Sequence, residues 1–89
     1  MQVAASHILV DSLEKANDLK TKITNGADFG QLAMTESKCP SGKSGGNLGA
    51  FTRGQMVKPF EDASFNAPIG TVTDPVQTQF GYHLILRTA

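Results

Sequence analysis

The apolar positions near the two ends of the chain predict strands. Residues 3–10 (VAASHILV) form a short apolar run that stops at polar residues, which is typical of a strand buried on both faces. Residues 82–88 (YHLILRT) alternate, which places Tyr82, Leu84 and Leu86 on one face of a sheet and His83, Ile85 and Arg87 on the other. We expect these two strands, the strongest in the chain, side by side at the centre of a sheet.

A period near 3.6 residues predicts helices between these strands. The helix over residues 12–25 has apolar positions Leu13, Ala16, Leu19 and Ile23. Asp11 and Glu14 resemble a capping box at its start, and Asn25-Gly26 supplies a left-handed stop. A second, shorter helix is predicted from a cap at Asp28 to about Ser37. A third begins at Pro59, a residue suited to a first helical position, with apolar positions Phe60, Ala63 and Phe65.

Two weaker strands complete the pattern. Residues 48–54 read as a short strand, and residues 71–78 as a strand that Pro75 interrupts, which favours an edge or a bulge. Turns are expected at 66–70 and 79–81. The order strand, helix, helix, loop, strand, helix, strand, strand predicts an α+β fold, with a few helices packed around one small sheet. A chain of 89 residues is expected to form one domain over 1–89.

Composition narrows the function. Lys plus Arg equals Asp plus Glu at 8 each, so bulk charge argues against nucleic-acid or membrane-surface binding. No apolar run approaches the length of a membrane span, and no signal peptide is recognised. The single cysteine excludes a disulfide within the chain and favours a reducing, cytoplasmic compartment. A monomer is expected.

The glycine-rich stretch at residues 37–49 (SKCPSGKSGGNLG) contains the Gly-Lys-Ser that ends a phosphate-binding P-loop. The match fails on context. Ser37 stands where the first glycine belongs, the preceding residues look helical, and Gly45-Gly46 cannot open a helix well. A nucleotide site is therefore not predicted here, and a flexible surface loop is the plain alternative.

His7 and His83 lie in the middle of apolar strands, and Cys39 is the lone thiol. Either histidine alone would be read as a hydrogen-bonded core residue, but two of them favour a shared network. Zinc is a poor interpretation, because two histidines and one cysteine give at most three ligands without short paired spacings. Cys39 beside two histidines suggests a nucleophile, but no cysteine-protease signature surrounds it, so an inert loop thiol is an equal alternative.

Four segments carry a family resemblance: HILV at 7–10, CPSGKSGGNLGAF at 39–51, RGQMVKPFE at 53–61 and FGYHLI at 80–85. In this order and spacing they resemble the parvulin family of peptidyl-prolyl cis/trans isomerases, over essentially the whole chain. The resemblance implies a four-stranded antiparallel sheet wrapped by three to four helices. It also implies an active site on the sheet face, between the glycine-rich loop and the third helix.

The resemblance also implies roles for single residues. Leu48, Met56 and Phe60 would form a slot for the proline ring, although ordinary core is the plain alternative for all three. His7, His83 and Thr78 match the family's paired histidines and a linked hydroxyl. Cys39 matches a position that holds Cys or Asp and faces the substrate carbonyl, which argues against obligatory covalent attack. Gln55 would donate to the substrate backbone, and Phe80 would cover one wall.

The implied reaction is rotation about an X-Pro bond, whose barrier is about 18–20 kcal/mol. No bond breaks, so binding the twisted form more tightly suffices, and neither metal nor cofactor is required. The expected partners are proline-containing peptides or unfolded protein segments. Val10 passes directly to Asp11, without the basic cluster that phosphate-reading members carry, so phospho-specificity is not expected. A non-catalytic peptide-binding or chaperone module is the alternative, and a redox function without a second cysteine is remote.

Overall fold

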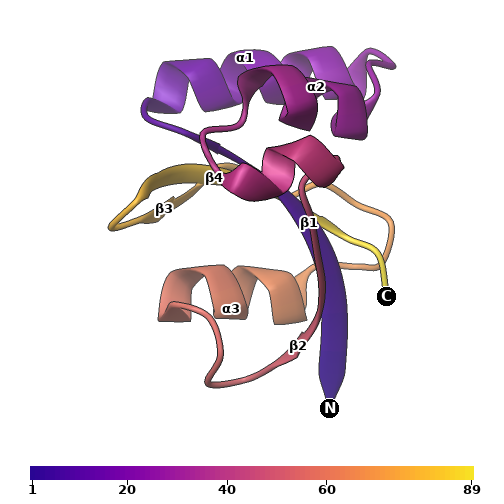
Figure 1. The fold of residues 1–89 in the computed structure, drawn as a ribbon, viewed down its shortest axis with the longest axis vertical. Helices are drawn as coiled ribbons and strands as arrows, with labels where there is room; N and C mark the ends of the chain where they lie inside the picture. The colour runs from indigo at the N-terminus through magenta and orange to yellow at the C-terminus, as the bar shows by residue number, and fades with distance from the viewer.

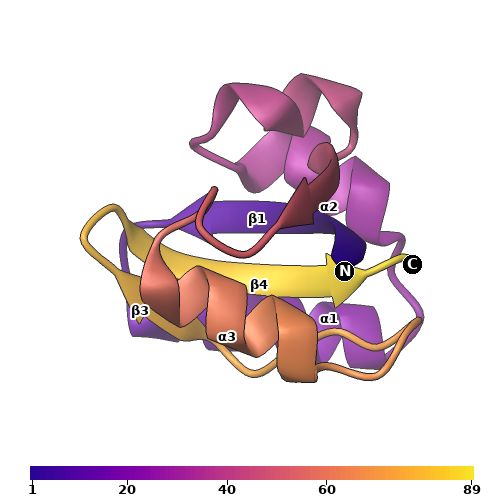
Figure 2. The same cartoon turned by 90° about the horizontal axis from the view of Figure 1, so that it is seen from below.

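One antiparallel sheet organises the chain in the computed structural model, which describes residues 1–89. Its strand order is β2–β1–β4–β3, so the first and last strands lie at the centre as predicted. The strands are β1 (Gln2–Val10), β2 (Asn47–Thr52), β3 (Val76–Thr78) and β4 (Gly81–Arg87). Helices α1 (Leu13–Thr24) and α2 (Phe29–Glu36) cover one face, α3 (Lys58–Asn66) covers the other, and a short 3₁₀ helix η1 (Pro40–Ser44) follows α2 (Figures 1 and 2). The predicted α+β fold is confirmed.

The two central strands are buried on both faces because each separates two clusters of apolar side chains. Ile8, Val10 and Leu84 pack with α1 and α2 on one side of the sheet. Val3, Ala5 and Ile85 pack with Phe51 and Phe60 on the other. The alternation of side chains along a strand sends neighbours to opposite clusters. The two faces predicted for residues 82–88 are confirmed. The same alternation directs His7 and His83 toward α3, where both rings meet Phe60.

The predicted helices are present with small shifts at their ends. The capping box at Asp11 is wrong: Ser12 has extended backbone and its hydroxyl accepts the Lys15 N–H at 3.1 Å, so Ser12 is the cap. Asp28 caps α2 as predicted, through the Gln31 N–H at 2.9 Å. α3 begins at Lys58, one residue before Pro59. Part of the glycine-rich stretch forms η1, which the sequence pattern did not predict.

The third strand is shorter than the predicted 71–78. Only Val76–Thr78 pairs regularly with β4, and Val72 makes one isolated bridge to Leu86. Pro75 lies between the two and has no N–H to continue a ladder. Its expected place at a sheet edge is confirmed by the strand order. β2 is also shorter than predicted, because Arg53 and Gly54 already belong to a turn.

None of the three α-helices is both long and apolar enough to cross a membrane. No group of three or more histidine, cysteine, aspartate and glutamate side chains comes together in a way that would hold a metal ion.

Candidate active site

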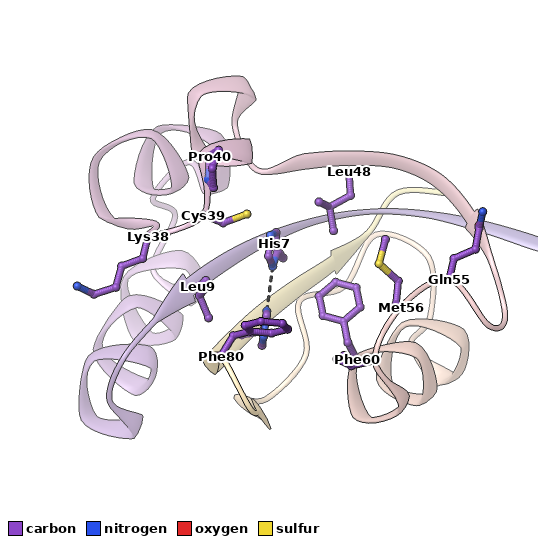
Figure 3. Close-up of a pocket in the computed structure, with 12 residues that line it drawn as sticks. His7, Leu9, Lys38, Cys39, Pro40, Leu48, Gln55, Met56, Phe60 and Phe80 are labelled. Carbon is purple, nitrogen blue, oxygen red and sulfur yellow. Dashed lines mark hydrogen bonds between the residues drawn. The ribbon is translucent and has the colours of Figure 1, made fainter.

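A mostly apolar pocket of about 510 Å³ opens between η1, β2 and α3, on the sheet face that carries both histidines (Figure 3). Its lining contains His7, Leu9, Lys38, Cys39, Pro40, Leu48, Gln55, Met56, Val57, Phe60, Phe80 and His83. Apolar walls with a few convergent polar groups are the usual make-up of a ligand site.

A β-bulge directs Leu48 into this pocket. Ala5 pairs with Gly49, but Ser6 pairs with Asn47, so Leu48 is the extra residue of β2. Gly49 has a φ of +72°, a left-handed conformation that glycine adopts without strain. A bulge bends its strand and re-aims a side chain, which here turns Leu48 toward Met56 and Phe60 (Figure 3). The three side chains predicted to form a slot therefore line one cavity.

Phe60 belongs to both the core and the pocket. It is 3% exposed and packs with Phe51 and Ile85. Its ring also meets His7 and His83 edge-on, with centroids 5.4 Å and 5.2 Å away. Phe60 therefore belongs to the core and also lines the pocket, because α3 borders the pocket while it covers the sheet. Its role in a proline slot stays a prediction.

His7 and His83 form a hydrogen-bonded pair across the central strands. Their Nδ1 atoms lie 2.9 Å apart, and both residues are at most 5% exposed. Thr78 Oγ1 lies 2.7 Å from His83 Nε2 and also accepts the Phe80 N–H at 3.1 Å. The predicted coupling of the two histidines through adjacent strands, with Thr78 at one end, is confirmed as geometry.

Ser41 connects the pair to Cys39. Its hydroxyl lies 3.2 Å from His7 Nε2 and donates to Cys39 Sγ, also at 3.2 Å. Since Thr78 already accepts from the Phe80 amide, its own proton is available for His83. One proton arrangement then runs in a single direction from Thr78 through His83, His7 and Ser41 to the sulfur, and it satisfies every member. No buried side-chain nitrogen or oxygen in the chain lacks a partner.

Both imidazoles are held in the uncharged form. Burial, followed by the neighbouring His83, lowers the pKa of His7 from 6.5 to about 4. Burial also lowers the pKa of His83. At neutral pH, therefore, the floor of the pocket presents two neutral rings and no fixed cation.

The glycine-rich stretch is fastened to β1 beside His7. Gly46 has a φ of +84°, and its carbonyl accepts the His7 N–H at 2.9 Å. A Cβ at Gly46 would stand 2.3 Å from the His7 carbonyl oxygen, so no side chain fits. The space beside Gly46 is filled by the backbone of β1. η1, which follows Cys39, brings Ser41 against His7.

The pocket gathers all but one of the nine residues singled out from the sequence, and Thr78 lies just behind it, bonded to His83. Gln55 stands at the rim, and its side-chain carbonyl accepts the Thr52 N–H at 2.7 Å, which leaves its amide NH₂ to donate. Phe80 forms a wall and is 61% exposed. Their roles in binding or catalysis stay predictions.

Sequence reasoning missed Ser41, Lys38 and Leu9. Leu9 carries a recognisable signal, because it follows His7 by two and so shares its face of β1. Ser41 gives no such signal, since its position depends on the fold of η1.

Comparisons with known proteins agree with this geometry. A family model described as the PPIC-type PPIase domain matches residues 1–88. The foldase protein PrsA of a Geobacillus species (strain WCH70) is 48% identical over 88 residues, which are 98% of this chain and 32% of the relative. The crystal structure of the peptidylprolyl isomerase PrsA from Bacillus anthracis matches with a TM-score of 0.97 and 43% identity, over 99% of this chain and 41% of that one.

The solution structure of NmPin, the parvulin of Nitrosopumilus maritimus, matches with a TM-score of 0.89 and 45% identity, over 99% of this chain and 96% of that one. The chain belongs to the PPIC-type peptidyl-prolyl cis/trans isomerase family, the parvulins. It is a peptidyl-prolyl isomerase domain, and it spans about a third of the length of the curated PrsA relatives that it matches.

Proposed function

We propose that this domain takes the proline ring of a flexible X-Pro segment into the slot of Leu48, Met56 and Phe60 and lowers the rotation barrier without covalent chemistry. The observation that carries the proposal is the position of this apolar slot directly over a buried, uncharged and fully hydrogen-bonded histidine pair. The slot supplies affinity for an apolar ring, and the polar chain beside it supplies a fixed electrostatic environment for the amide.

The physical basis is differential binding. A planar amide is held by resonance, which polarises its carbonyl, and twisting removes that resonance and with it part of the polarity. A pocket with few hydrogen-bond donors removes water from the amide carbonyl. The planar amide, whose carbonyl is more polar, loses more by this than the twisted amide does. An enzyme gains rate only from interactions that favour the twisted state, and an apolar slot with a neutral floor is suited to do so.

Cys39 is proposed to tune this environment. Its sulfur accepts from Ser41 and lies at the pocket wall, where the carbonyl before proline would face it. No bond to the substrate has to form or break for rotation to occur, so attack by the thiol is not needed. The link through Ser41 connects the sulfur to the same network as the histidines.

A phosphorylated residue before proline is not proposed as the preferred substrate. Only Asp11 and Ser12 separate β1 from α1, and Lys15 on α1 is already paired with Glu36. Lys38 is the one cation among the pocket-lining residues, and it pairs with Asp11 at 3.3 Å between exposed side chains. One exposed lysine gives much less than a clamp of several charge-assisted hydrogen bonds.

The wider role rests on the relatives. The curated relatives are named foldases, so we propose that the protein carrying this domain assists folding of proline-containing, unfolded segments. The zero net charge of the chain disfavours nucleic-acid and membrane-surface partners, and the monomeric state stays a prediction. The reducing compartment expected from the free thiol stays a prediction. A chaperone module that binds without catalysing is the second candidate, favoured by the exposed Phe80 at the pocket.

NMR exchange spectroscopy on a matched set of peptides tests the function. Ala-Pro, Lys-Pro and phospho-Ser-Pro peptides of one scaffold are followed with substoichiometric protein. We expect accelerated cis/trans exchange for Ala-Pro, without a preference for the phosphorylated peptide. Binding without acceleration would select the chaperone reading. A phospho-Ser-Pro rate far above the Ala-Pro rate would show that Lys38 and its neighbours form a phosphate site.

A further inference from the structure

The carboxylate of Glu61 is buried beside the pocket, and the proposed reaction gives it no role. Its side chain is 7% exposed, on the helix turn that follows Phe60. Burying a carboxylate is costly unless hydrogen bonds compensate it, and replacing such a group by an apolar one is often neutral or stabilising. Stability alone is therefore a weak reason for a glutamate here, and its contacts indicate another.

Glu61 holds the turn that leads from β2 to α3. Its Oε1 accepts the Gly54 N–H at 2.6 Å, and its Oε2 accepts from Arg53 Nη1 at 3.0 Å. Gly54 has a φ of +92°, a conformation that residues other than glycine rarely adopt. The Arg53 guanidinium also lies 4.4 Å from the centroid of the Phe65 ring. Two consecutive residues of the turn are thus fixed to α3.

The same turn carries one wall of the pocket. Gln55 and Met56 follow Gly54 directly, and both line the cavity opposite Leu48 (Figure 3). Gln55 is itself bent back, since its side-chain carbonyl accepts the Thr52 N–H. Among the hydrogen bonds at this turn, the bond from the Gly54 amide to Glu61 is the one that joins its backbone to α3.

We infer that Glu61 is a positioning residue, which holds the Gln55–Met56 wall at the separation from Phe60 that a proline ring requires. The inference rests on the slot proposed above and deepens it. Removing the clamp leaves the apolar side chains in place but lets the wall move, so substrate affinity falls while the histidine network keeps its geometry. The carboxylate acts through the Gly54 peptide and does not touch the substrate.

Hydrogen exchange tests the clamp without any substrate. Gly54 is exposed, so only its bond to Glu61 protects its amide. We expect the Gly54 amide of the wild type to be protected from exchange. Its exchange rate should stay within about threefold in Glu61→Gln, whose amide oxygen still accepts, and should rise by about tenfold or more in Glu61→Leu. Asp62→Asn is the matched control, because Asp62 bonds the same Arg53 Nη1 at 3.3 Å but not the backbone of the turn. An unprotected Gly54 in the wild type would overturn the clamp, even if Glu61→Leu fails to fold.

Peptide titration tests the positioning role. For an Ala-Pro peptide we expect Kd and KM to rise about tenfold in Glu61→Leu and less than threefold in Glu61→Gln and Asp62→Asn, with unchanged ring ¹⁵N shifts of the histidines. Met56→Ala separates the two hypotheses. If it weakens binding and Glu61→Leu does not, the slot stands and the positioning role is wrong. If neither weakens binding, the slot itself is wrong, and the positioning role fails with it.

Discussion

His7 Nδ1 and His83 Nδ1 lie 2.9 Å apart, and this contact joins residues that are 76 positions apart in the chain. Of two nitrogens that face each other, one must carry a proton and the other must not, so two neutral rings need matched tautomers and two charged rings would lose the contact. The pair lies under the slot and connects Thr78 at one end to Ser41 and Cys39 at the other.

Coupling between the rings is measurable in unfolding. Removing either ring leaves a buried nitrogen of the other without its partner, so we expect His7→Ala and His83→Ala each to lower the free energy of unfolding by about 1–3 kcal/mol. The double variant should cost less than the sum, because its second change removes a group that is already unsatisfied. Urea titration of the four proteins gives the coupling, and strictly additive losses would contradict the pairing.

The lowered histidine pKa values predict a pH dependence with a definite sign. The pKa of His7 is about 4 in the fold against 6.5 ordinarily, so between these values the unfolded chain binds a proton that the folded chain does not. Stability is therefore complete above about pH 6.5 and falls as the pH drops toward 4. We expect the free energy of unfolding to fall by about 1–2 kcal/mol between pH 7 and 5. This loss is smaller than the full pKa shifts would give, because the rings border an open pocket.

Urea unfolding across this range checks the pH dependence. The carboxylates of Glu36, Asp62 and Asp74 have pKa values lowered by their lysine partners, so they add losses only at lower pH. A His7→Phe, His83→Phe variant that folds should lose most of the slope between pH 7 and 5. A slope that persists in that variant would assign the effect to other groups.

Substitution of Cys39 separates tuning from covalent attack. If the sulfur tunes the field at the carbonyl, Cys39→Asp should keep kcat/KM within about tenfold and Cys39→Ala should lose only part of it. If Cys39 is instead a nucleophile, both variants should lose all turnover, and mass spectrometry of the wild type should detect a covalent adduct with the substrate. Ser41→Ala is the companion variant, since it cuts the link to His7 while the thiol stays.

Lys38 predicts a modest effect on the residue before proline. As the single cation of the pocket lining, it should weakly disfavour a basic residue there relative to an acidic one, by much less than a phosphate clamp would. We expect Lys38→Glu to raise the ratio of kcat/KM for Lys-Pro peptides to kcat/KM for Glu-Pro peptides by about two- to fivefold. This is the effect expected from one surface charge screened by solvent. The apolar Ala-Pro peptide serves as control, and an equal change for all three peptides would show that Lys38 acts through structure.

The sequence pattern predicts much of the fold and of the candidate site. The features that it does not predict depend on contacts or conformations that a local pattern does not contain. The apolar character of β1 and β4 predicts the two histidines on neighbouring central strands, because the most apolar strands of a small sheet take its centre. The cap of α1 is Ser12 and not the predicted Asp11, because both residue types are good caps and the backbone conformation selects between them. β3 was predicted too long, because Pro75 ends its ladder. Ser41 and Glu61 depend on contacts between distant segments, which no local pattern reveals.

The slot itself is tested most directly by cis/trans exchange rates of an Ala-Pro peptide with wild type, Met56→Ala and Met34→Ala at equal, substoichiometric concentrations. Met34 is the matched control, since it is 56% exposed on α2 and does not line the pocket. We predict that the wild type and Met34→Ala accelerate exchange equally and that Met56→Ala loses about tenfold or more of kcat/KM while remaining folded. Equal acceleration by all three proteins would contradict the account, because the proline ring would then be bound elsewhere.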